Sequence, residues 1–127
     1  MKSKLNIIGR VGRDPEMKFT PSGTGVCKFS VATDRSYTNN GEKVKETTWF
    51  QVTAWGKLAE VCNEYVKKGM LVDIEGRLEP DKATGGPRIW EKDGVAKSSF
   101  EVTANEITFL SKQEPAKSSA AIDEEPF

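Results

Sequence analysis

Apolar and polar residues alternate along most of the chain, which is the pattern of β-strands that bury one face. In residues 25–37, "GVCKFSVATDRSY", every second position is suited to a protein core: Cys27, Phe29, Val31 and Thr33. The dipeptide Asn40-Gly41 follows and indicates a two-residue hairpin turn. Residues 44–56, "VKETTWFQVTAWG", alternate again and predict the return strand of this hairpin.

Three further segments are predicted to be strands. Residues 4–11 predict a first strand, which we expect to continue through Pro15 to a Pro-Ser-Gly turn at residues 21–23. Residues 70–78 direct four apolar side chains toward the core: Met70, Val72, Ile74 and Leu78. Residues 98–110 predict the closing strand. Residues 80–97 between them are rich in glycine, proline and charge, so we expect a long mobile loop or a hairpin tip there.

One segment has a helical period instead. In residues 57–69, "KLAEVCNEYVKKG", apolar side chains recur at i, i+3, i+4, i+7 and i+8: Leu58, Val61, Cys62, Tyr65 and Val66. Lys67 and Lys68 fall in the predicted last turn, and Gly69 lies just beyond it, which is typical of a helix end. The pattern therefore predicts one helix that packs this stripe on the sheet.

The order of these elements is three strands, one helix and two strands. This order matches the OB fold, a five-stranded Greek-key barrel, and a closed barrel leaves no long strand edge exposed. We therefore predict an all-β fold with one helix over residues 1–111. In residues 112–127 the alternation is lost and Ser, Ala, Pro and charged residues prevail, so we expect a disordered acidic tail.

The balance of charge changes between the predicted domain and its tail. The 127 residues suit one domain, and the 19 basic and 19 acidic side chains cancel. Taken alone, this cancellation argues against a nucleic-acid partner, since phosphate binders usually carry a basic excess. Residues 112–127, however, hold 2 lysines and 4 carboxylates, which leaves 17 basic and 15 acidic residues in the first 111. The predicted domain is mildly basic and the tail is acidic.

The chain lacks the side chains that most catalytic and metal sites require. It has no histidine to act as a general base, only two cysteines, and no phosphate loop of P-loop or Rossmann spacing. A structural zinc site usually needs four Cys or His ligands, so we expect no metal, no cofactor and no enzymatic activity. Cys27 lies in a predicted strand and Cys62 on the helical stripe, which favours two buried thiols over a disulfide.

Nothing in the N-terminal sequence resembles a targeting segment. "MKSKLNIIGR" is interrupted by polar residues too early for a signal peptide, and no run approaches the roughly 20 apolar residues of a membrane span. Unpaired cysteines also fit a reducing compartment. We therefore expect a cytoplasmic protein.

The strand at residues 47–55 carries aromatic side chains on both faces. Trp49 and Trp55 share a face with Gln51 and Thr53, opposite Phe50, so these rings cannot all enter one small core. Two partners would cover the outer tryptophans. Unpaired bases stack on such rings with about 1–3 kcal/mol per base in single-strand binders, and a second subunit would bury the same surface. The strand alone favours the two alternatives equally.

Two further aromatic residues favour bases. Tyr37 is predicted at the hairpin tip and Trp90 in the long loop. Five cations flank them: Lys43, Lys45, Lys82, Arg88 and Lys92. Five more extend a cationic track as predicted phosphate contacts: Lys18, Lys28, Arg35, Lys57 and Arg77. Such a groove would bind backbone charge and base faces, so we expect it to hold single strands with little sequence specificity.

Three stretches carry a resemblance to a known family: "NIIGRVGRDPEMKFTPSGTGVCKFSVAT", "WFQVTAWGKLAEVCNEYVKKGMLVDIEGRL" and the terminal "DEEPF". Together they resemble bacterial-type single-stranded DNA-binding proteins. The resemblance implies an OB fold, a homotetramer, and sequence-independent binding of single-stranded DNA during replication, recombination and repair in the cytoplasm, at the nucleoid. It also implies that Tyr37, Trp49 and Trp55 stack on bases.

The chain departs from the family pattern at one stacking position. The family's further stacking tryptophan is expected near "DKATGG", where this chain has Ala83 and no aromatic residue. Trp90 lies seven residues later. Either Trp90 takes over the role in a loop of altered length, or this contact is missing.

The C-terminal tip suggests a second function. Phe127 combines an aromatic ring with a carboxylate, an arrangement that suits an apolar pocket rimmed by Arg or Lys, and Pro126 stiffens the preceding step. Asp123, Glu124 and Glu125 would contact basic surface around that pocket. The resemblance implies that this tip recruits DNA-maintenance proteins. Two alternatives remain open, an RNA-binding OB-fold protein and an adaptor that binds no nucleic acid.

Overall fold

The computed structural model describes residues 1–110 and contains one helix and seven strands within that range. The predicted tail, residues 112–127, lies outside the described residues. In chain order the elements are β1 (Leu5–Val11), β2 (Glu16–Phe19), β3 (Gly25–Asn39), β4 (Glu42–Trp55), α1 (Lys57–Tyr65), β5 (Leu71–Leu78), β6 (Arg88–Lys92) and β7 (Val95–Phe109).

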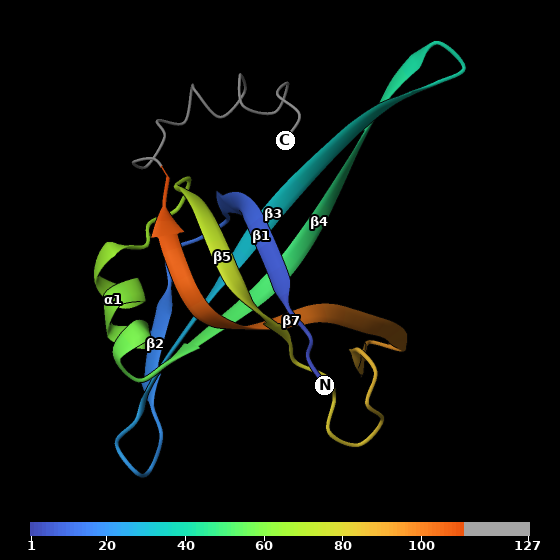
Figure 1. Ribbon diagram of the computed structural model, residues 1–127. Coiled ribbons are helices and arrows are strands. Elements are labelled where there is room, and N and C mark those ends of the chain that lie inside the picture. Colours follow the sequence, from blue (N-terminus) through green and yellow to red (C-terminus); the bar gives the residue numbers. More distant parts are fainter. Residues whose placement is uncertain (111–127) are drawn as a thin grey trace.

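Five of these strands close into a barrel (Figure 1). The strand order is β1-β5-β7-β4-β3, and β3 returns to pair with β1 through Arg10 opposite Ala32 and Val11 opposite Val31. Strands β4 and β7 run parallel, whereas the other neighbours in the barrel are antiparallel. Strand β2 pairs with β3 and β6 pairs with β7, outside the closed ring. The predicted five-stranded OB barrel with one helix is confirmed.

The core fills the barrel and extends under the helix. It contains 14 buried residues: Ile7, Val11, Cys27, Phe29, Val31, Val52, Ala54, Ala59, Cys62, Val66, Val72, Ile74, Val102 and Ala104. Both cysteines are free and fully buried, as predicted. Burial raises the pKa of the Cys27 thiol, and it raises the pKa of Cys62 to about 12. Both side chains therefore act as small apolar groups of the core.

The helix is shorter than predicted and presents a different face. It ends at Tyr65, and Val66 already has an extended backbone, so Lys67 and Lys68 lie beyond it. Its buried residues are Ala59 and Cys62, followed by Val66, whereas Val61 and Tyr65 are exposed. The Tyr65 ring instead approaches the ring of Phe109, with 6.1 Å between centroids. The predicted stripe was therefore wrong at Val61 and Tyr65.

The N-terminal strand is interrupted where we expected continuity. Strand β1 ends at Val11, and β2 begins at Glu16 as a separate strand that pairs with β3. Pro15 has no N–H to donate to a ladder, which suits the break. The β5 prediction also failed at its end, because a bulge between Glu75 and Gly76 shifts the register and leaves Leu78 50% exposed.

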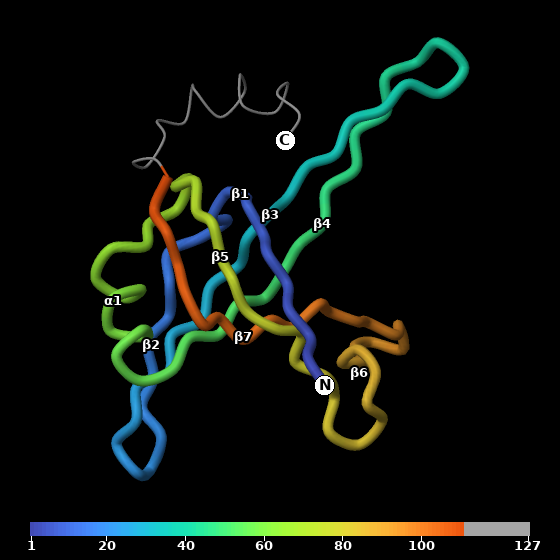
Figure 2. The backbone as a smooth tube through the Cα atoms, in the orientation of Figure 1, coloured from blue at the N-terminus to red at the C-terminus, as the bar shows by residue number. Residues whose placement is uncertain are grey.

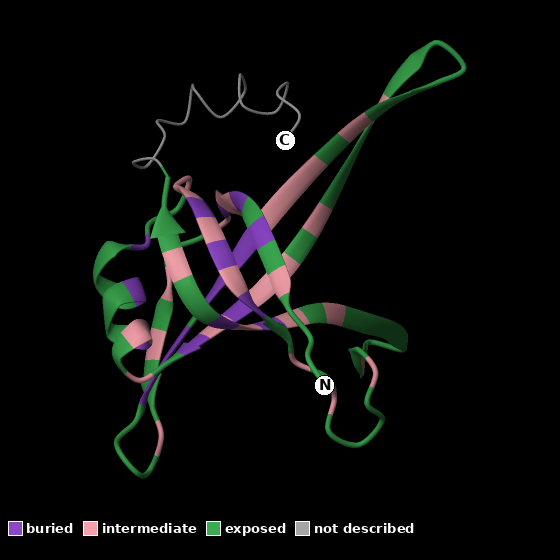
Figure 3. Ribbon diagram, viewed as in Figure 1, coloured by how far each residue is buried: buried purple, intermediate pink, exposed green. Residues whose placement is uncertain are grey.

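Two long hairpins, β3–β4 and β6–β7, extend from the barrel beyond the short β2–β3 hairpin (Figures 1 and 2). The β3–β4 arm turns at Asn40-Gly41, where φ is 51° and 80°, so the predicted two-residue turn is confirmed. The segment predicted as a long loop or hairpin tip contains β6, a second turn at Asp93-Gly94 and the start of β7. A loop remains only between Leu78 and Arg88. Buried residues gather in the barrel, whereas both arms are largely exposed (Figure 3).

Candidate nucleic-acid interface

Strand β4 separates its aromatic side chains between two faces, as its alternation predicts. Val52 and Ala54 are fully buried in the barrel, and Phe50 is half-buried. Trp49 and Trp55 lie on the opposite face, where they are 49% and 50% exposed. Half of each indole is therefore available to a partner along this outer face.

The neighbouring strands complete the outer surface on both sides of β4. On the β3 side, Lys28 lies opposite Thr53 and the buried Ser30 lies opposite Gln51. On the β7 side, Glu101 lies beside Gln51 in the parallel pairing, and Thr103 lies beside Thr53. The result is a polar floor with a tryptophan near each end.

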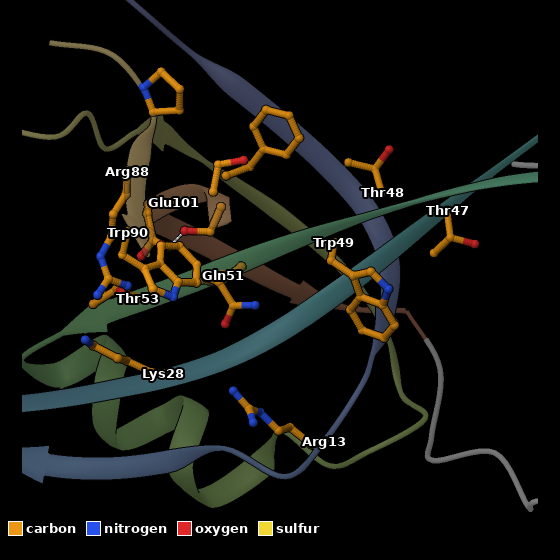
Figure 4. A pocket seen from close by; sticks show the side chains of 15 residues that line it. Arg13, Lys28, Thr47, Thr48, Trp49, Gln51, Thr53, Arg88, Trp90 and Glu101 are labelled. Carbon is orange, nitrogen blue, oxygen red and sulfur yellow. Dashed lines mark hydrogen bonds between the residues drawn. The ribbon is translucent and has the colours of Figure 1, made fainter. Parts of the chain in front are cut away.

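This floor lies in two adjoining grooves. The first has a volume of about 800 Å³ and holds Trp49 and Trp90 (Figure 4). The second has a volume of about 610 Å³ and holds Trp55. Both are lined by Lys28, Thr53 and Glu101, so the two grooves adjoin at these residues of the floor. The three tryptophans of the chain therefore line one connected surface.

Trp90 reaches this surface from a strand and not from a loop, which corrects the prediction. It lies on β6 opposite Lys97 of β7. The guanidinium of Arg88 lies 4.8 Å from the centroid of the indole, within cation–π distance. Trp90 lies 12 residues beyond the end of β5, and the β6–β7 hairpin places it in the groove that holds Trp49.

Tyr37 lies apart from the two grooves. It is on β3, opposite Val44 in the projecting arm, so the turn at Asn40-Gly41 and not Tyr37 forms the tip. Arg35 lies 4.9 Å from the ring centroid and also pairs with Glu46 at 3.5 Å. A hydrogen bond with Glu46 raises the pKa of the Tyr37 phenol, and the nearby Arg35 opposes this shift. Tyr37 is 37% exposed as a residue and lines neither groove.

The ten predicted phosphate contacts divide into three groups. Five line the two grooves: Lys18, Lys28, Arg77, Lys82 and Arg88. Three lie on the β3–β4 arm: Arg35, Lys43 and Lys45. Two line neither groove: Lys57, which begins α1, and Lys92 at the end of β6.

Four of these cations already have carboxylate partners. The pairs are Lys18–Glu16 at 3.7 Å, Arg35–Glu46 at 3.5 Å, Lys45–Asp34 at 3.6 Å and Arg77–Glu79 at 2.8 Å. The carboxylates lower the local positive potential. A phosphate that binds any of these four side chains must therefore compete with a carboxylate.

Sequence reasoning missed two charged residues that line the grooves and one that lies beside Trp90. Arg13 follows β1 and lines the Trp49 groove, although its local sequence predicts no particular face. Lys97 lies opposite Trp90, which only the pairing of β6 with β7 reveals. Glu101 has the opposite parity to the buried Val102, so alternation alone would have placed its side chain on the outer face.

Neither metal nor membrane features appear in the described part of the chain. Residues 1–110 contain no cluster of three or more potential metal-ligating side chains. Over the same range, no helix has the length and apolar character needed to cross a membrane.

Comparison with known proteins identifies the family. The model of the single-strand binding protein family matches residues 3–110. This chain belongs to that family. The single-stranded DNA-binding protein of Neisseria meningitidis is 42% identical over 109 residues, which cover 85% of this chain and 59% of the relative. The chain thus spans about three fifths of that relative's length. The family resemblance inferred from the sequence is confirmed.

Two further comparisons extend this similarity. The single-stranded DNA-binding protein of Aquifex aeolicus is 38% identical over 126 residues, covering 98% of this chain and 81% of the relative. Among solved structures, that of a Plasmodium falciparum SSB complex with ssDNA matches with a TM-score of 0.72 and 26% identity. It covers 87% of this chain and 96% of the other. The barrel is therefore shared with members of the single-strand binding family.

Proposed function

We propose that this single-strand binding family member binds single-stranded DNA along the outer face of β4, with little sequence specificity. The observation that carries the proposal is the pair of half-exposed indoles, Trp49 and Trp55, on a polar strand face whose reverse is buried in the core. A base that stacks on an indole removes apolar area from water without reading a base edge. Family members are the standard example of this mode of binding.

The geometry favours an unpaired strand over a duplex. Stacking on Trp49, Trp55 or Trp90 requires bases whose faces are free, and in a duplex those faces are covered by neighbouring base pairs. We assign phosphate contacts first to the groove cations, Lys18, Lys28, Arg77, Lys82 and Arg88, because they lie along the path of the tryptophans. Lys57 and Lys92 line neither groove, so we assign them a weaker, longer-range attraction.

Tyr37, with Arg35, Lys43 and Lys45, is assigned to a second contact on the projecting arm. The ring is partly exposed and carries a guanidinium on one face, so a base would stack on the other. Trp90 is assigned the role of the family's later stacking tryptophan. Its place in the Trp49 groove supports this assignment.

Membership of the family supports a proposal for the biological role. We assign to this protein the coating of single strands during replication, recombination and repair, as a homotetramer in the cytoplasm, at the nucleoid. Residues 1–111 would form the DNA-binding domain. Residues 112–127 would form a linker with an acidic tip, in which Asp123, Glu124, Glu125, Pro126 and Phe127 recruit DNA-maintenance proteins.

Binding to matched oligomers tests the DNA-binding proposal. A DNA single strand, an RNA single strand of the same sequence and a DNA duplex of equal length are compared by mobility shift. Tightest binding to the DNA single strand is the expected result. Tighter binding to RNA would indicate an RNA-binding protein, since the 2′-hydroxyl distinguishes the two. No binding to any of the three would favour an adaptor.

The recruiting role is tested by removing residues 123–127. The truncated protein should bind single-stranded DNA as tightly as the full chain or more tightly, because three carboxylates that compete for the domain's cations are lost. A DNA-maintenance enzyme that co-purifies with the full chain should no longer do so. Equal capture by both forms would contradict recruitment by the tip.

A further inference from the structure

A carboxylate stands on the floor of the proposed binding surface. Glu101 lies beside Gln51 in the parallel pairing of β4 with β7. It lines both the Trp49 groove, where Figure 4 shows it, and the Trp55 groove, so it lies at the point where the two meet. A strand that passes from one tryptophan to the other must therefore pass Glu101.

The hydrogen bonding of Glu101 differs from that of the neighbouring groove carboxylate. Glu79 is held by the guanidinium of Arg77 at 2.8 Å and by the hydroxyl of Thr103 at 2.8 Å. Glu101 accepts a hydrogen bond from the neutral hydroxyl of Ser99. An ionised carboxylate has about four acceptor sites, so this hydrogen bond leaves Glu101 able to accept from a ligand.

The charges on the two sides of β4 orient a bound strand. Lys28 lies on the β3 side, opposite Thr53, whereas Glu101 lies on the β7 side, beside Gln51. A phosphate is attracted to Lys28 and repelled by Glu101. At the nucleotide that lies between Lys28 and Glu101, the backbone should therefore lie toward β3, and the base edge should point toward Glu101. The phosphates of the flanking nucleotides are left to Arg88 in the Trp49 groove and to Arg77 and Lys82 in the Trp55 groove.

Base edges differ in what they offer to a carboxylate. Cytosine and adenine carry an exocyclic amino group that donates hydrogen bonds, and acidic side chains are known to accept from the cytosine N4 group. Thymine presents the O4 acceptor at the corresponding place. A carboxylate that faces this edge is therefore attracted to an amino group and repelled by a carbonyl.

We propose that Glu101 is a specificity-determining residue, which favours amino-bearing bases over thymine at a nucleotide held between the tryptophans. The inference rests on the proposed function, since it requires unpaired bases in these grooves. Glu101 would add a preference for certain bases at one nucleotide, on a surface that otherwise contacts the faces of bases and the phosphates.

The substitution Glu101→Gln tests this role. A glutamine amide both donates and accepts, so it can pair with the amino group of cytosine or with O4 of thymine. Affinities for oligo(dC) and oligo(dT) of equal length are measured at neutral pH for the wild type and the variant. The preference for oligo(dC) relative to oligo(dT) should fall roughly two- to tenfold in the variant, as expected for loss of one discriminating hydrogen bond.

A matched variant separates base reading from a general effect of charge. Glu106→Gln removes the same charge from the same strand, at an exposed residue that lines neither groove. Both variants should bind both oligomers somewhat more tightly, because one phosphate-repelling charge is lost, but only Glu101→Gln should change the ratio of the two affinities.

The outcomes distinguish this inference from the proposed function. A ratio that is unchanged or increased in Glu101→Gln, or one that falls equally in Glu106→Gln, would overturn the role of Glu101 while single-strand binding stands. Failure of the wild-type protein to bind either oligomer would overturn the proposed function itself.

Discussion

The alternation of strand β4 gives it two faces, one of which packs into the barrel core while the other is exposed to solvent. The inner face places Phe50, Val52 and Ala54 toward the barrel, where the last two are fully buried. The outer face carries the larger rings, Trp49 and Trp55, and leaves half of each exposed. Hydrophobicity alone would bury the indoles first. A small closed barrel has room only for side chains that match its interior, so the largest aromatic residues remain outside.

The outer face is also held in place, as a binding surface should be. An ideal Cβ on Gly12 would lie 2.4 Å from Cζ3 and 2.8 Å from Cη2 of Trp49. Glycine at this position therefore allows the indole to lie against the connection after β1. The inner face of β4 therefore contributes to stability and the outer face to binding. Substitutions on the inner face should change the free energy of unfolding, and substitutions on the outer face should change the affinity for DNA.

The largest expected effect follows removal of both outer indoles. The double substitution Trp49→Ala and Trp55→Ala should weaken binding to oligo(dT) by about 1–3 kcal/mol for each stacked base, the range known for single-strand binders of this class. Isothermal titration or competition binding provides the measurement. Unchanged affinity would mean that these rings face another subunit.

A substitution on the inner face of β4 should lower stability and leave DNA binding unchanged. Val52→Ala removes two methyl groups from a fully buried position and leaves a cavity, so the free energy of unfolding should fall by about 2 kcal/mol. Urea denaturation measures this loss. Below the unfolding transition, the affinity for oligo(dT) should stay close to that of the wild type. A variant that loses affinity as strongly as the tryptophan double variant would contradict the separation of the two faces.

A smaller loss of affinity is expected from a substitution at Gly12, against which the Trp49 ring lies. Gly12→Ala should displace the Trp49 ring and weaken oligo(dT) binding by at most about 1–3 kcal/mol, the contribution of one stacked base. Gly86→Ala is the matched control, because the nearest atom to its Cβ would be Thr84 Oγ1 at 3.7 Å. Equal affinities of the two variants would show that Gly12 does not position Trp49.

The smallest effect should be seen at the buried thiols. Burial raises the pKa of Cys27 and raises that of Cys62 to about 12, so both stay protonated as pH rises through the neutral range. A thiol-specific reagent at pH 8 should therefore modify the folded protein very slowly and the urea-unfolded protein rapidly. Rapid modification of the folded protein would show that the core side of the barrel opens to solvent.

Short sequence patterns predicted those features of the fold that depend on residues close together in the sequence. Alternation separated Val52 from Trp49, and Asn40-Gly41 predicted the first hairpin turn, because each signal lies within a few residues of its effect. The second hairpin was predicted only as an alternative to a long loop over residues 80–97, although Asp93-Gly94 is a similar turn signal. Strand β6 and the first residues of β7 lack an apolar face toward the core, since Ile89 and Val95 are both exposed, so alternation did not identify them.

The composition of the site depended on pairing between distant residues. Arg13 reaches the grooves because the chain turns after β1, and no local pattern contains that information. Alternation places Glu101 on the outer face of β7, but only the parallel pairing of β7 with β4 brings it beside Gln51. The helix stripe was misplaced for a related reason: the nine-residue helix contacts β2, β3 and β4, and that contact decides that Ala59 is buried and Tyr65 is not. Predictions for residues 112–127 lie outside the described residues and stay predictions.

The central claim is that the outer face of β4 stacks on unpaired bases, and intrinsic fluorescence tests it most directly. The chain has three tryptophans, and all three line the two grooves, so a ligand that covers this surface should change the signal. The protein is titrated with oligo(dT) and with a duplex of matched length, at low and high salt. Deep quenching by the single strand, much of it persisting at high salt, is the predicted result, since stacking is less sensitive to salt than phosphate contacts are. Absence of quenching with oligo(dT) would contradict stacking of bases on these rings, and it would indicate that Trp49 and Trp55 lie in a subunit interface instead.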